Sequence, residues 1–360
     1  MKYRKKMCIY LLSGVLFCGL IAGCSSKSEQ EETSKIETQQ DIDTSDYAER
    51  DIFAMDTYMT VTAYGDRAEE AVDAAEQEID RLDSLLSTAN SESEIYIVNE
   101  NGSEILSEDT ALLLEKSLEL YDSTNGLFDI TVYPLMQEWG FTTEKYKVPK
   151  SKRIEELLQN VDASKIEFET TEQLLTLPEG VKIDLGGIAK GYTSGRIMEI
   201  FKEYGIQSGI VSLGGNVQTY GSKPDGSFWK VAVQNPDILS DSSEYIGVLE
   251  IKDKAVITSG GYERYFEEDN QIYHHILNPK TGYPADLGLS SVTIVSADGM
   301  LADGLSTSLF VMGKKKALNY WREYSDLFDA ILVENDGAIT ITEGLEEAFS
   351  SDFDVTVEYR

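Results

Sequence analysis

Residues 181–213 of the chain read VKIDLGGIAKGYTSGRIMEIFKEYGIQSGIVSL, and the order of the patterns within them indicates the fold class. A short apolar run at residues 181–185 predicts a strand, and the double glycine after it separates that strand from a helical pattern over residues 189–204. Residues 209–213 predict the next strand. The segment therefore predicts a strand, a helix and a second strand in succession.

The patterns on either side do not continue a regular alternation of strands and helices. On the N-terminal side they predict a strand, two helices and an apolar irregular stretch with a buried Trp139, at residues 52–64, 68–86, 109–121 and 134–140. On the C-terminal side they predict strands at residues 229–233, 245–251, 255–258, 262–266, 272–276 and 291–296, helices at 302–312 and 315–324, and a last hairpin turning at 336–337. This order predicts an α+β fold with mixed or antiparallel sheets and packed helices.

The double glycine of residues 184–191 (DLGGIAKG) is suited to a phosphate group. Glycines let a ligand approach the backbone, the amides at the start of the following helix face an anion, and Lys190 adds a mobile cation. The spacing matches neither the P-loop nor the dinucleotide-binding glycine motif. A tight turn between a strand and a helix also requires glycine, so this segment alone leaves a purely structural role open.

Asp303 and Thr307 are four residues apart in the helical pattern of residues 302–312, which places both side chains on one face. A carboxylate and a hydroxyl presented together are hard oxygen donors of the kind that Mg²⁺ prefers. The alternative is that Asp303 caps the helix and Thr307 has no role. The spacing by itself favours that alternative.

The two histidines of the chain are adjacent, at positions 274 and 275. Neighbouring residues of a strand point to opposite faces, so a metal centre with two histidine ligands is not expected. One of them can act as an acid or base near neutral pH or stack against a ligand. The alternative, two exposed histidines without a role, fits poorly with the flanking Tyr273 and Ile276.

The formal net charge of −33 limits the partners of the protein. A surface with this much negative charge repels the phosphate backbone of nucleic acids and the anionic headgroups of lipids. We therefore expect no nucleic-acid partner. A bound phosphate ligand would need a cation to screen it. The charge therefore favours a metal ion in any phosphate-binding site.

The N-terminus has the features of a secretory signal. A basic start precedes an apolar run at residues 7–22, which is short for a transmembrane span, and residues 20–24 read LIAGC. This ending resembles the bacterial lipobox, which predicts a signal peptide at residues 1–23 and a diacylglycerol chain on Cys24. An ordinary signal peptide or an uncleaved anchor is the alternative.

The segment after the predicted signal is too polar to fold. Residues 24–46 are rich in Ser, Glu, Gln, Thr and Lys, which predicts a disordered tether, and residues 47–360 then form one large domain or two intimate lobes. Cys8 and Cys18 would be removed with the signal, so no thiol is left for a disulfide, a metal ligand or a nucleophile. We expect a protein anchored by its lipid on the extracytoplasmic face of the cell membrane.

Short motifs along the folded part resemble, in their order, those of the FAD:protein FMN transferases, the ApbE family of flavin transferases. They are residues 55–57 (MDT), 125–129 (NGLFD), 184–191 (DLGGIAKG), 212–216 (SLGGN), 258–264 (TSGGYER), 275–282 (HILNPKTG) and 302–307 (ADGLST). The resemblance covers the chain from about residue 52 to the last hairpin. It implies an ApbE-like, T-fold-like architecture.

The resemblance also implies a Mg²⁺-dependent enzyme that binds FAD as its substrate. Such an enzyme moves FMN through a phosphoester bond onto a Ser or Thr hydroxyl of an acceptor flavoprotein with a Ser/Thr-Gly-Ala-Thr-like segment, and it releases AMP. The implied Mg²⁺ ligands are Asp303, Thr307 and the backbone at Gly187. The implied FAD contacts are Met55, Ala89, Leu127, Phe128, Asp129, Asp184, Lys190, His275 and Ile276. His275 and Asp303 are both candidates for the group that takes the proton of the hydroxyl.

Three positions depart from the usual family pattern: Asp56 replaces a glycine, Asn278 precedes Pro279 in place of an aspartate, and Gly304 replaces an alanine. Near the position of Ala89 an aromatic residue is common in the family. Two other functions stay open on the sequence alone. One is a pyrophosphatase that cuts FAD to FMN and AMP, and the other is a non-enzymatic FAD-binding lipoprotein of the surface.

Overall fold

The computed structural model describes residues 46–237 and 244–360. The predicted signal peptide at residues 1–23, the lipid-bearing Cys24 and nearly all of the predicted tether at residues 24–46 lie outside the described residues. Among the helices of the described part, none combines the length and the apolar character needed to span a bilayer.

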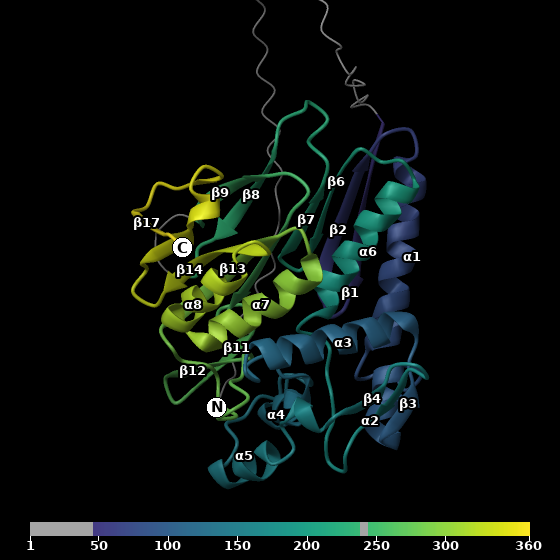
Figure 1. Ribbon diagram of the computed structural model, residues 1–360, viewed down its shortest axis with the longest axis vertical. Helices are drawn as coiled ribbons and strands as arrows, with labels where there is room; N and C mark the ends of the chain where they lie inside the picture. Colours follow the sequence, from purple (N-terminus) through teal and green to yellow (C-terminus); the bar gives the residue numbers. More distant parts are fainter. Residues whose placement is uncertain (1–45, 238–243) are drawn as a thin grey trace, which may run out of the picture. The chain divides into compact units, whose positions relative to one another are not determined.

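A nine-stranded sheet forms the centre of the described part (Figure 1), in the order β1-β2-β6-β7-β10-β13-β14-β15-β17. Neighbouring strands are antiparallel except for β15 and β17, which are parallel. The predicted α+β fold with mixed sheets is therefore confirmed. The strands are β1 (Tyr47–Ala54), β2 (Thr57–Tyr64), β6 (Ser208–Leu213), β7 (Asn216–Tyr220), β10 (Ala255–Gly260), β13 (Leu289–Ser296), β14 (Phe328–Glu334), β15 (Ile339–Thr342) and β17 (Val355–Glu358).

Four helices cover one face of this sheet: α1 (Ala68–Leu86), α6 (Ala189–Glu203), α7 (Gly299–Met312) and α8 (Lys314–Tyr324). In α1 the residues at helical spacing, from Ala71 to Leu86, are buried against the sheet as their periodicity predicts. In α7 nearly every side chain is buried, because α6 and α8 flank it and the sheet lies beneath it. Helix α7 is thus a central core helix, and any polar side chain on it needs a partner.

A smaller sheet packs on the opposite face. It has the order β16-β9-β8 and consists of β8 (Trp229–Gln234), β9 (Tyr245–Ile251) and β16 (Phe349–Ser350). Its apolar side chains form one cluster with β10, β13, β14 and β15, and Tyr64, Ile210 and Val217 lie at the edge of that cluster. The cover does not extend to Phe53 and Tyr58, which are 63% and 79% exposed. The outer face of the β1–β2 end is therefore bare.

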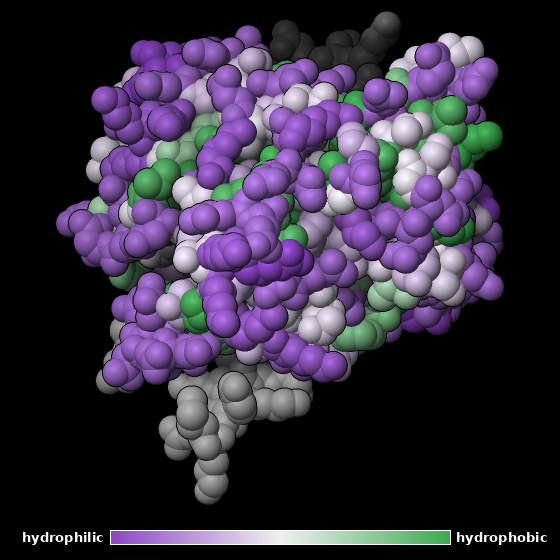
Figure 2. Space-filling view, turned by 90° about the horizontal axis from the view of Figure 1, so that it is seen from below, coloured by the Kyte–Doolittle hydropathy of each residue, from purple (hydrophilic) through white to green (hydrophobic). Residues whose placement is uncertain are grey.

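The remaining elements lie below the sheet in Figure 1, except the 3-10 helix η3 (Glu343–Leu345), which contacts β14. They are α2 (Glu94–Asn101), α3 (Glu108–Ser123), α4 (Tyr133–Trp139), α5 (Ser151–Leu158), the short sheet of β3 (Ser103–Ile105), β4 (Glu167–Glu169) and β5 (Leu174–Thr176), the hairpin of β11 (Tyr265–Glu268) and β12 (Gln271–His274), and the 3-10 helices η1 (Ile130–Val132) and η2 (Ala163–Lys165). Trp139 is fully buried, as predicted, and its indole N–H donates to the carbonyl oxygen of Gly282 at 2.8 Å. On the face shown in Figure 2, hydrophilic residues dominate and hydrophobic ones form small separate patches.

Three local predictions are wrong. Residues 52–64 are not one strand, because Met55 and Asp56 take φ values of 49° and 59° and turn the chain into the β1–β2 hairpin. Residues 134–140 are mostly helical in α4 rather than irregular, with the proline in the first turn, where it is tolerated. Residues 181–185 form no strand, because the side chain of Asn99 bonds both the N–H and the carbonyl oxygen of Ile183, at 2.7 and 2.8 Å.

Candidate functional site

The site is built on a close crossing of α6 and α7. A β-carbon added to Gly191 would collide with the carbonyl oxygen of Gly299 and would lie only 2.6 Å from Cβ of Asp303. Only glycine fits at such a separation, which explains why this residue follows Lys190. The crossing brings the start of α6, with its N–H groups and its lysine, against the carboxylate on α7.

Asp303 is 5% exposed, and both of its carboxylate oxygens are hydrogen-bonded. The N–H of Gly191 donates to Oδ2 at 2.8 Å, and the side-chain amide of Asn216 donates to Oδ1 at 3.0 Å. Asp303 does not cap α7: Asp298 does so, by accepting the N–H of Leu301 at 3.0 Å. The helix-cap interpretation of Asp303 is therefore wrong, and its carboxylate faces the start of α6.

Thr307 lies one turn after Asp303 and is half-buried. Its hydroxyl is 3.2 Å from the hydroxyl of Ser259, at the end of β10, and Ser259 also bonds Ser306 at 2.8 Å. Both proposed side-chain ligands are thus presented by one helix beside further hydroxyl oxygens. Among residues 46–237 and 244–360, no cluster of three or more His, Cys, Asp or Glu side chains could enclose a metal ion.

Lys190 faces a set of titratable groups. It is close enough to affect the pKa of Asp184, Glu263, His275 and Asp303. Burial raises the pKa of Asp303, and Lys190 together with the N–H of Gly191 opposes that rise. Burial likewise raises the pKa of Asp184, although the N–H of Gly186 donates to its carboxylate at 2.8 Å. Lys190 therefore lies among acids that burial makes reluctant to ionise.

Two hairpin tips border the crossing. The Met55–Asp56 turn joins β1 to β2, and the thioether of Met55 accepts the hydroxyl of Thr193 on α6 at 3.8 Å. Asp56, where the family usually has glycine, adopts the positive φ that a glycine would take, and its charge contributes to the raised pKa of Asp184. The neighbouring turn holds Gly214, at a φ of 60°, where a β-carbon would lie 2.7 Å from a methyl carbon of Thr57. The two turns are thus packed together.

Phe128 packs beneath the glycine loop. It is 4% exposed, and its ring would lie 3.4 Å from a β-carbon added to Gly187 and 3.5 Å from one added to Gly304. The ring therefore lies against both the glycine loop and α7. At Gly304 the alanine that is usual in the family would collide with the side chain of Leu120.

Asp129 is held in a local turn. It caps η1, with the N–H and the hydroxyl of Thr131 donating to Oδ1 at 2.9 and 2.6 Å. Its Oδ2 is buried and has no hydrogen-bond partner within the described residues. Burial raises the pKa of Asp129, and Lys280 partly opposes this. The next residue, Ile130, accepts the N–H of Asp184 at 2.9 Å, which joins this turn to the glycine loop.

The two histidines face opposite ways, as the strand pattern predicts. Nδ1 of His275 lies 3.2 Å from the carbonyl oxygen of Arg264, whereas Nε2 of His274 lies 3.0 Å from that of Ala285, and the ring of His274 packs on Phe310. Because a carbonyl oxygen only accepts, His275 carries its proton on Nδ1 and leaves Nε2 as an acceptor. Desolvation, followed by the charge of Arg264, lowers the pKa of His275 to about 3, so the ring is neutral.

Glu263 and Arg264 belong to the site, although sequence reasoning assigned them no role beyond membership of the TSGGYER motif. Both are accessible to solvent yet crowded by protein, as on the wall of a cleft. Desolvation raises the pKa of Glu263 to about 7, with Asp303 adding to the rise and Lys190 opposing it. Arg264 is fixed by a 2.6 Å bond from its guanidinium to the carbonyl oxygen of Phe141. Only tertiary contacts identify this pair: desolvation and neighbouring charges act on Glu263, and Arg264 bonds Phe141 and His275 through its guanidinium and its carbonyl oxygen.

Three implied FAD contacts lie outside this cluster. Ala89 is on the exposed loop after α1, where its N–H donates to the hydroxyl of Ser87 at 3.1 Å. Ile276 is 4% exposed and packs in the main core, and Leu127 packs against the same core. Ile276 and Leu127 therefore pack in or against the main core that supports the site, whereas the contact described for Ala89 is within its own loop.

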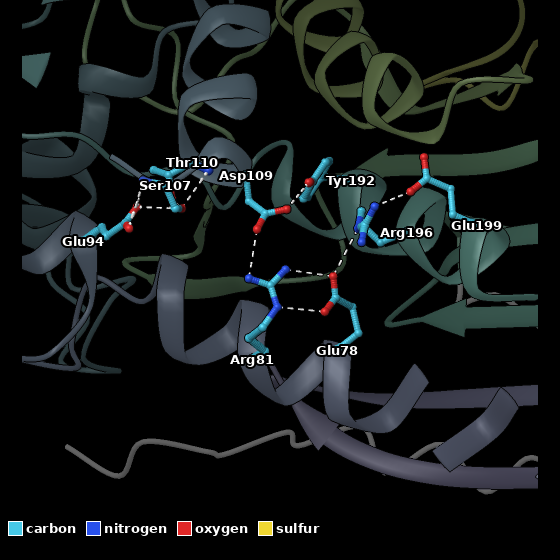
Figure 3. A network of polar contacts seen from close by, with 9 residues as sticks. All are labelled: Glu78, Arg81, Glu94, Ser107, Asp109, Thr110, Tyr192, Arg196 and Glu199. Carbon is cyan, nitrogen blue, oxygen red and sulfur yellow. Dashed lines mark hydrogen bonds and ion pairs between the residues drawn. The ribbon is translucent and has the colours of Figure 1, made fainter. Parts of the chain in front are cut away.

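A polar network holds the outer side of α6 (Figure 3). The hydroxyl of Tyr192 donates to Asp109 at the start of α3, and Arg81 of α1 pairs with the same carboxylate at 2.9 Å. Arg81 also pairs with Glu78, which in turn receives Arg196 of α6 at 3.1 Å. Burial opposes ionisation of Asp109, yet the bonds from Tyr192 and Arg81 lower its pKa. The network ties α1, α3 and α6 together one turn beyond the glycine loop.

Comparison with known proteins agrees with this arrangement. A family model described as the ApbE family matches residues 55–332. The FAD:protein FMN transferase of Haemophilus influenzae is 30% identical over 290 residues, covering 78% of this chain and 83% of the relative. The FAD:protein FMN transferase of Treponema pallidum is 28% identical over 366 residues, covering 95% of this chain and 96% of the relative.

A solved structure is similar as well. The ApbE protein of Thermotoga maritima superposes with a TM-score of 0.78 at 33% sequence identity, over 84% of this chain and 99% of that protein. The family match spans every motif of the site, from the Met55 turn to the Asp303 helix. The chain is therefore an enzyme that belongs to the ApbE family of flavin transferases.

Proposed function

We propose that this enzyme moves the FMN part of FAD onto a Ser or Thr hydroxyl of an acceptor protein, releases AMP and depends on Mg²⁺. The observation that carries the proposal is the α6–α7 crossing, where Gly191 places a cation, a helix start and a buried carboxylate together. FAD contains a pyrophosphate, and this crossing supplies what such an anion needs. Family membership supports the choice of FAD as the substrate.

The chain's own groups provide the anion-binding charge. Lys190 and Arg264 both act on Asp184, Glu263 and His275, so the two cations face the same space. The N–H groups at the start of α6 add the positive end of the helix dipole. In a protein with a net charge of −33, these cations and N–H groups are the part of the site that attracts a pyrophosphate, and they offset the acids around them.

Asp303 and Thr307 fit a magnesium site in which the protein supplies only a few of the ligands. Mg²⁺ is commonly held by one or two carboxylates together with phosphate oxygens and water, so one buried carboxylate and one hydroxyl are a sufficient protein contribution. Asp303 and Thr307 would hold it, together with the backbone at Gly187. When bound, the ion would polarise the phosphoryl group and neutralise charge on the leaving AMP.

His275 is the better candidate for accepting the proton. Its Nε2 is the nitrogen that can accept a proton, because Nδ1 bonds the carbonyl oxygen of Arg264 and the ring is neutral. Both oxygens of Asp303 already accept N–H groups. A bound pyrophosphate would offset the charges of Lys190 and Arg264 and so raise the pKa of His275 toward the range that proton transfer requires.

The reaction balances with these groups alone. The acceptor oxygen forms a bond to the phosphorus of the FMN phosphate, and the bond from that phosphorus to the bridging oxygen of the pyrophosphate breaks. The proton of the hydroxyl passes to Nε2 of His275, and AMP leaves with the bridging oxygen. Water in place of the hydroxyl would give FMN and AMP, which is the hydrolytic alternative.

We propose that the protein acts at the extracytoplasmic face of the membrane, held by the lipid on Cys24. The support is the lipobox-like ending LIAGC after a basic start and an apolar run. Replacement of Cys24 by alanine is expected to release the protein from the membrane fraction or to leave its signal uncleaved. Normal processing with unchanged membrane retention would exclude the lipid anchor.

The transfer is tested with FAD, Mg²⁺ and an acceptor domain carrying a Ser/Thr-Gly-Ala-Thr-like segment, by measuring flavin fluorescence on the denatured acceptor. Asp303→Asn removes the ligand charge and is expected to reduce the rate at least about a hundredfold, and EDTA to abolish transfer by the wild type. Asp298→Asn is the matched control, because it lies on the same helix and asparagine still caps. Free FMN and AMP without labelled acceptor would indicate a hydrolase, and bound FAD without turnover a carrier.

A further inference from the structure

An exposed aromatic pair lies beside the Met55–Asp56 turn. Phe53 and Tyr58 face each other across β1 and β2, with ring centroids 5.1 Å apart and planes at 68°. They are 63% and 79% exposed, although large aromatic side chains are the costliest to leave in water. Exposed apolar groups in such a cluster mark interaction surfaces in soluble proteins.

The pair is continuous with the site described above. The Ala54–Thr57 pair closes the turn, so Phe53 and Tyr58 form the next pair along the hairpin. Met55 is two positions after Phe53, roughly 7 Å along an extended chain. Met55 contacts α6, and Asp56 is near enough to affect Asp184. A molecule that covers the pair therefore also reaches the rim of the site.

Nothing in the described part of the fold covers the pair. The small sheet of β8, β9 and β16 packs against the large sheet only as far as Tyr64, Ile210 and Val217. On the outward face of β1 the acidic residues Glu49 and Asp51 lie between Tyr47 and Phe53. Their carboxylates are fixed by bonds from Thr62 and Thr60, at 3.1 and 2.7 Å.

We propose that Phe53 and Tyr58 form the docking surface for the acceptor protein. The inference rests on the proposed function, in which a second protein must bring a hydroxyl to a site at the end of this hairpin. The aromatic pair fits an apolar side chain of the acceptor's segment, and Glu49, Asp51 and Asp56 fit lysine or arginine residues that flank it. The partner is therefore an acceptor whose flavin-accepting segment combines an apolar side chain with basic neighbours.

The test measures binding apart from turnover. The probe is a purified domain with a Ser/Thr-Gly-Ala-Thr-like segment flanked by lysines, in which the reacting hydroxyl residue is replaced by alanine. Phe53→Ala combined with Tyr58→Ala is expected to weaken binding of this domain at least about tenfold, with the FAD affinity unchanged. Asp51→Asn is expected to weaken it less, and only at low ionic strength.

Tyr47→Ala is the matched control. Tyr47 is on the same face of the same strand and is 58% exposed, but it lies six residues from Phe53, roughly 20 Å. Equal binding by the wild type and the double variant, or no binding by either, would overturn the docking surface. A parallel loss of FAD affinity would also overturn it and assign the pair to the FAD pocket. A wild type that binds the probe but transfers no flavin to the intact acceptor contradicts the proposed function instead.

Discussion

Two parts of the site differ in how their charged groups are held. The first is the α6–α7 crossing with Asp303, which we call the floor, and the second is the Glu263–Arg264 segment, which we call the wall. On the floor, at the α6–α7 crossing, Asp303 is 5% exposed and receives two N–H donors from fixed positions. On the wall, Glu263 and Arg264 stay accessible to solvent, and the carboxylate of Glu263 takes a pKa of about 7 from its crowded surroundings. Backbone packing thus fixes the floor, whereas the wall is tuned by desolvation and neighbouring charge. Changes to the floor should therefore have larger effects than changes to the wall.

The largest effect is expected from Gly191→Ala. The added methyl group would meet the backbone of Gly299 and Cβ of Asp303, neither of which can rotate away. We expect a loss of about 3 kcal/mol in the free energy of unfolding and little remaining transfer activity. Denaturant unfolding and the acceptor-labelling assay measure the two.

Gly195→Ala on the same helix is the matched control. No atom lies within 4 Å of the position that its β-carbon would take. Alanine should therefore raise the free energy of unfolding by about 0.5–1 kcal/mol through its better helix propensity. Equal losses at both positions would show that the crossing is not tightly packed.

Lys190→Met is expected to have the next largest effect. Methionine keeps most of the side-chain stem and removes the charge, so FAD affinity should fall about tenfold to a hundredfold. The rate at saturating FAD should be largely retained, since the metal is the stronger neighbour of the reacting phosphoryl group. Lys202→Met, at the exposed end of the same helix, should change neither quantity. An unchanged FAD affinity in Lys190→Met would remove the lysine from the binding site.

Tyr192→Phe tests the support behind the floor. The substitution removes one hydrogen bond to Asp109 and should lower the free energy of unfolding by about 1 kcal/mol. Because α6 carries Lys190, the Michaelis constant for FAD should also rise, whereas a purely structural role would leave it unchanged. Glu199→Gln, at the exposed end of the network, should change stability by less than about 0.5 kcal/mol.

The smallest effect is expected on the wall, from Glu263→Gln. The folded-state pKa of Glu263 is raised to about 7, so its stabilising contribution is present below about pH 4.5 and is lost as the pH rises through 7. The variant should therefore be more stable than the wild type at pH 8 and about equal to it near pH 4.5. Because the side chain is accessible to solvent, screening limits the difference to about 0.5 kcal/mol.

Glu267→Gln on β11 controls for the loss of one negative charge from an acidic protein. A difference in stability that is the same for both variants, or that grows toward low pH, would contradict the raised pKa of Glu263. Thermal unfolding over pH 4.5–8 provides the comparison.

Much of the fold followed from the sequence because its patterns are local. The periodicity of residues 68–86 predicted α1, and Asp269 and Asn270, at φ values of 52° and 61°, turn the β11–β12 hairpin between the strands predicted at residues 262–266 and 272–276. The predictions were wrong where a side chain bonded the backbone in place of a neighbouring strand, and where a turn contained no glycine. Asn99 replaced a sheet partner for residues 181–185, and a two-residue turn of non-glycine residues at Met55 was hidden inside a continuous β-type pattern.

The sequence by itself determined the family, the α+β class and the acidic, cysteine-poor character of the folded part, because motif order and composition do not depend on packing. It also named Lys190 and Asp303. Only the tertiary structure decided that Gly191 lets these two meet, that Asp298 rather than Asp303 caps α7, and that Glu263 and Arg264 share the site. Those facts depend on desolvation and on close approach between segments more than a hundred residues apart, as for the Gly191–Asp303 bond, and no local pattern encodes such distances.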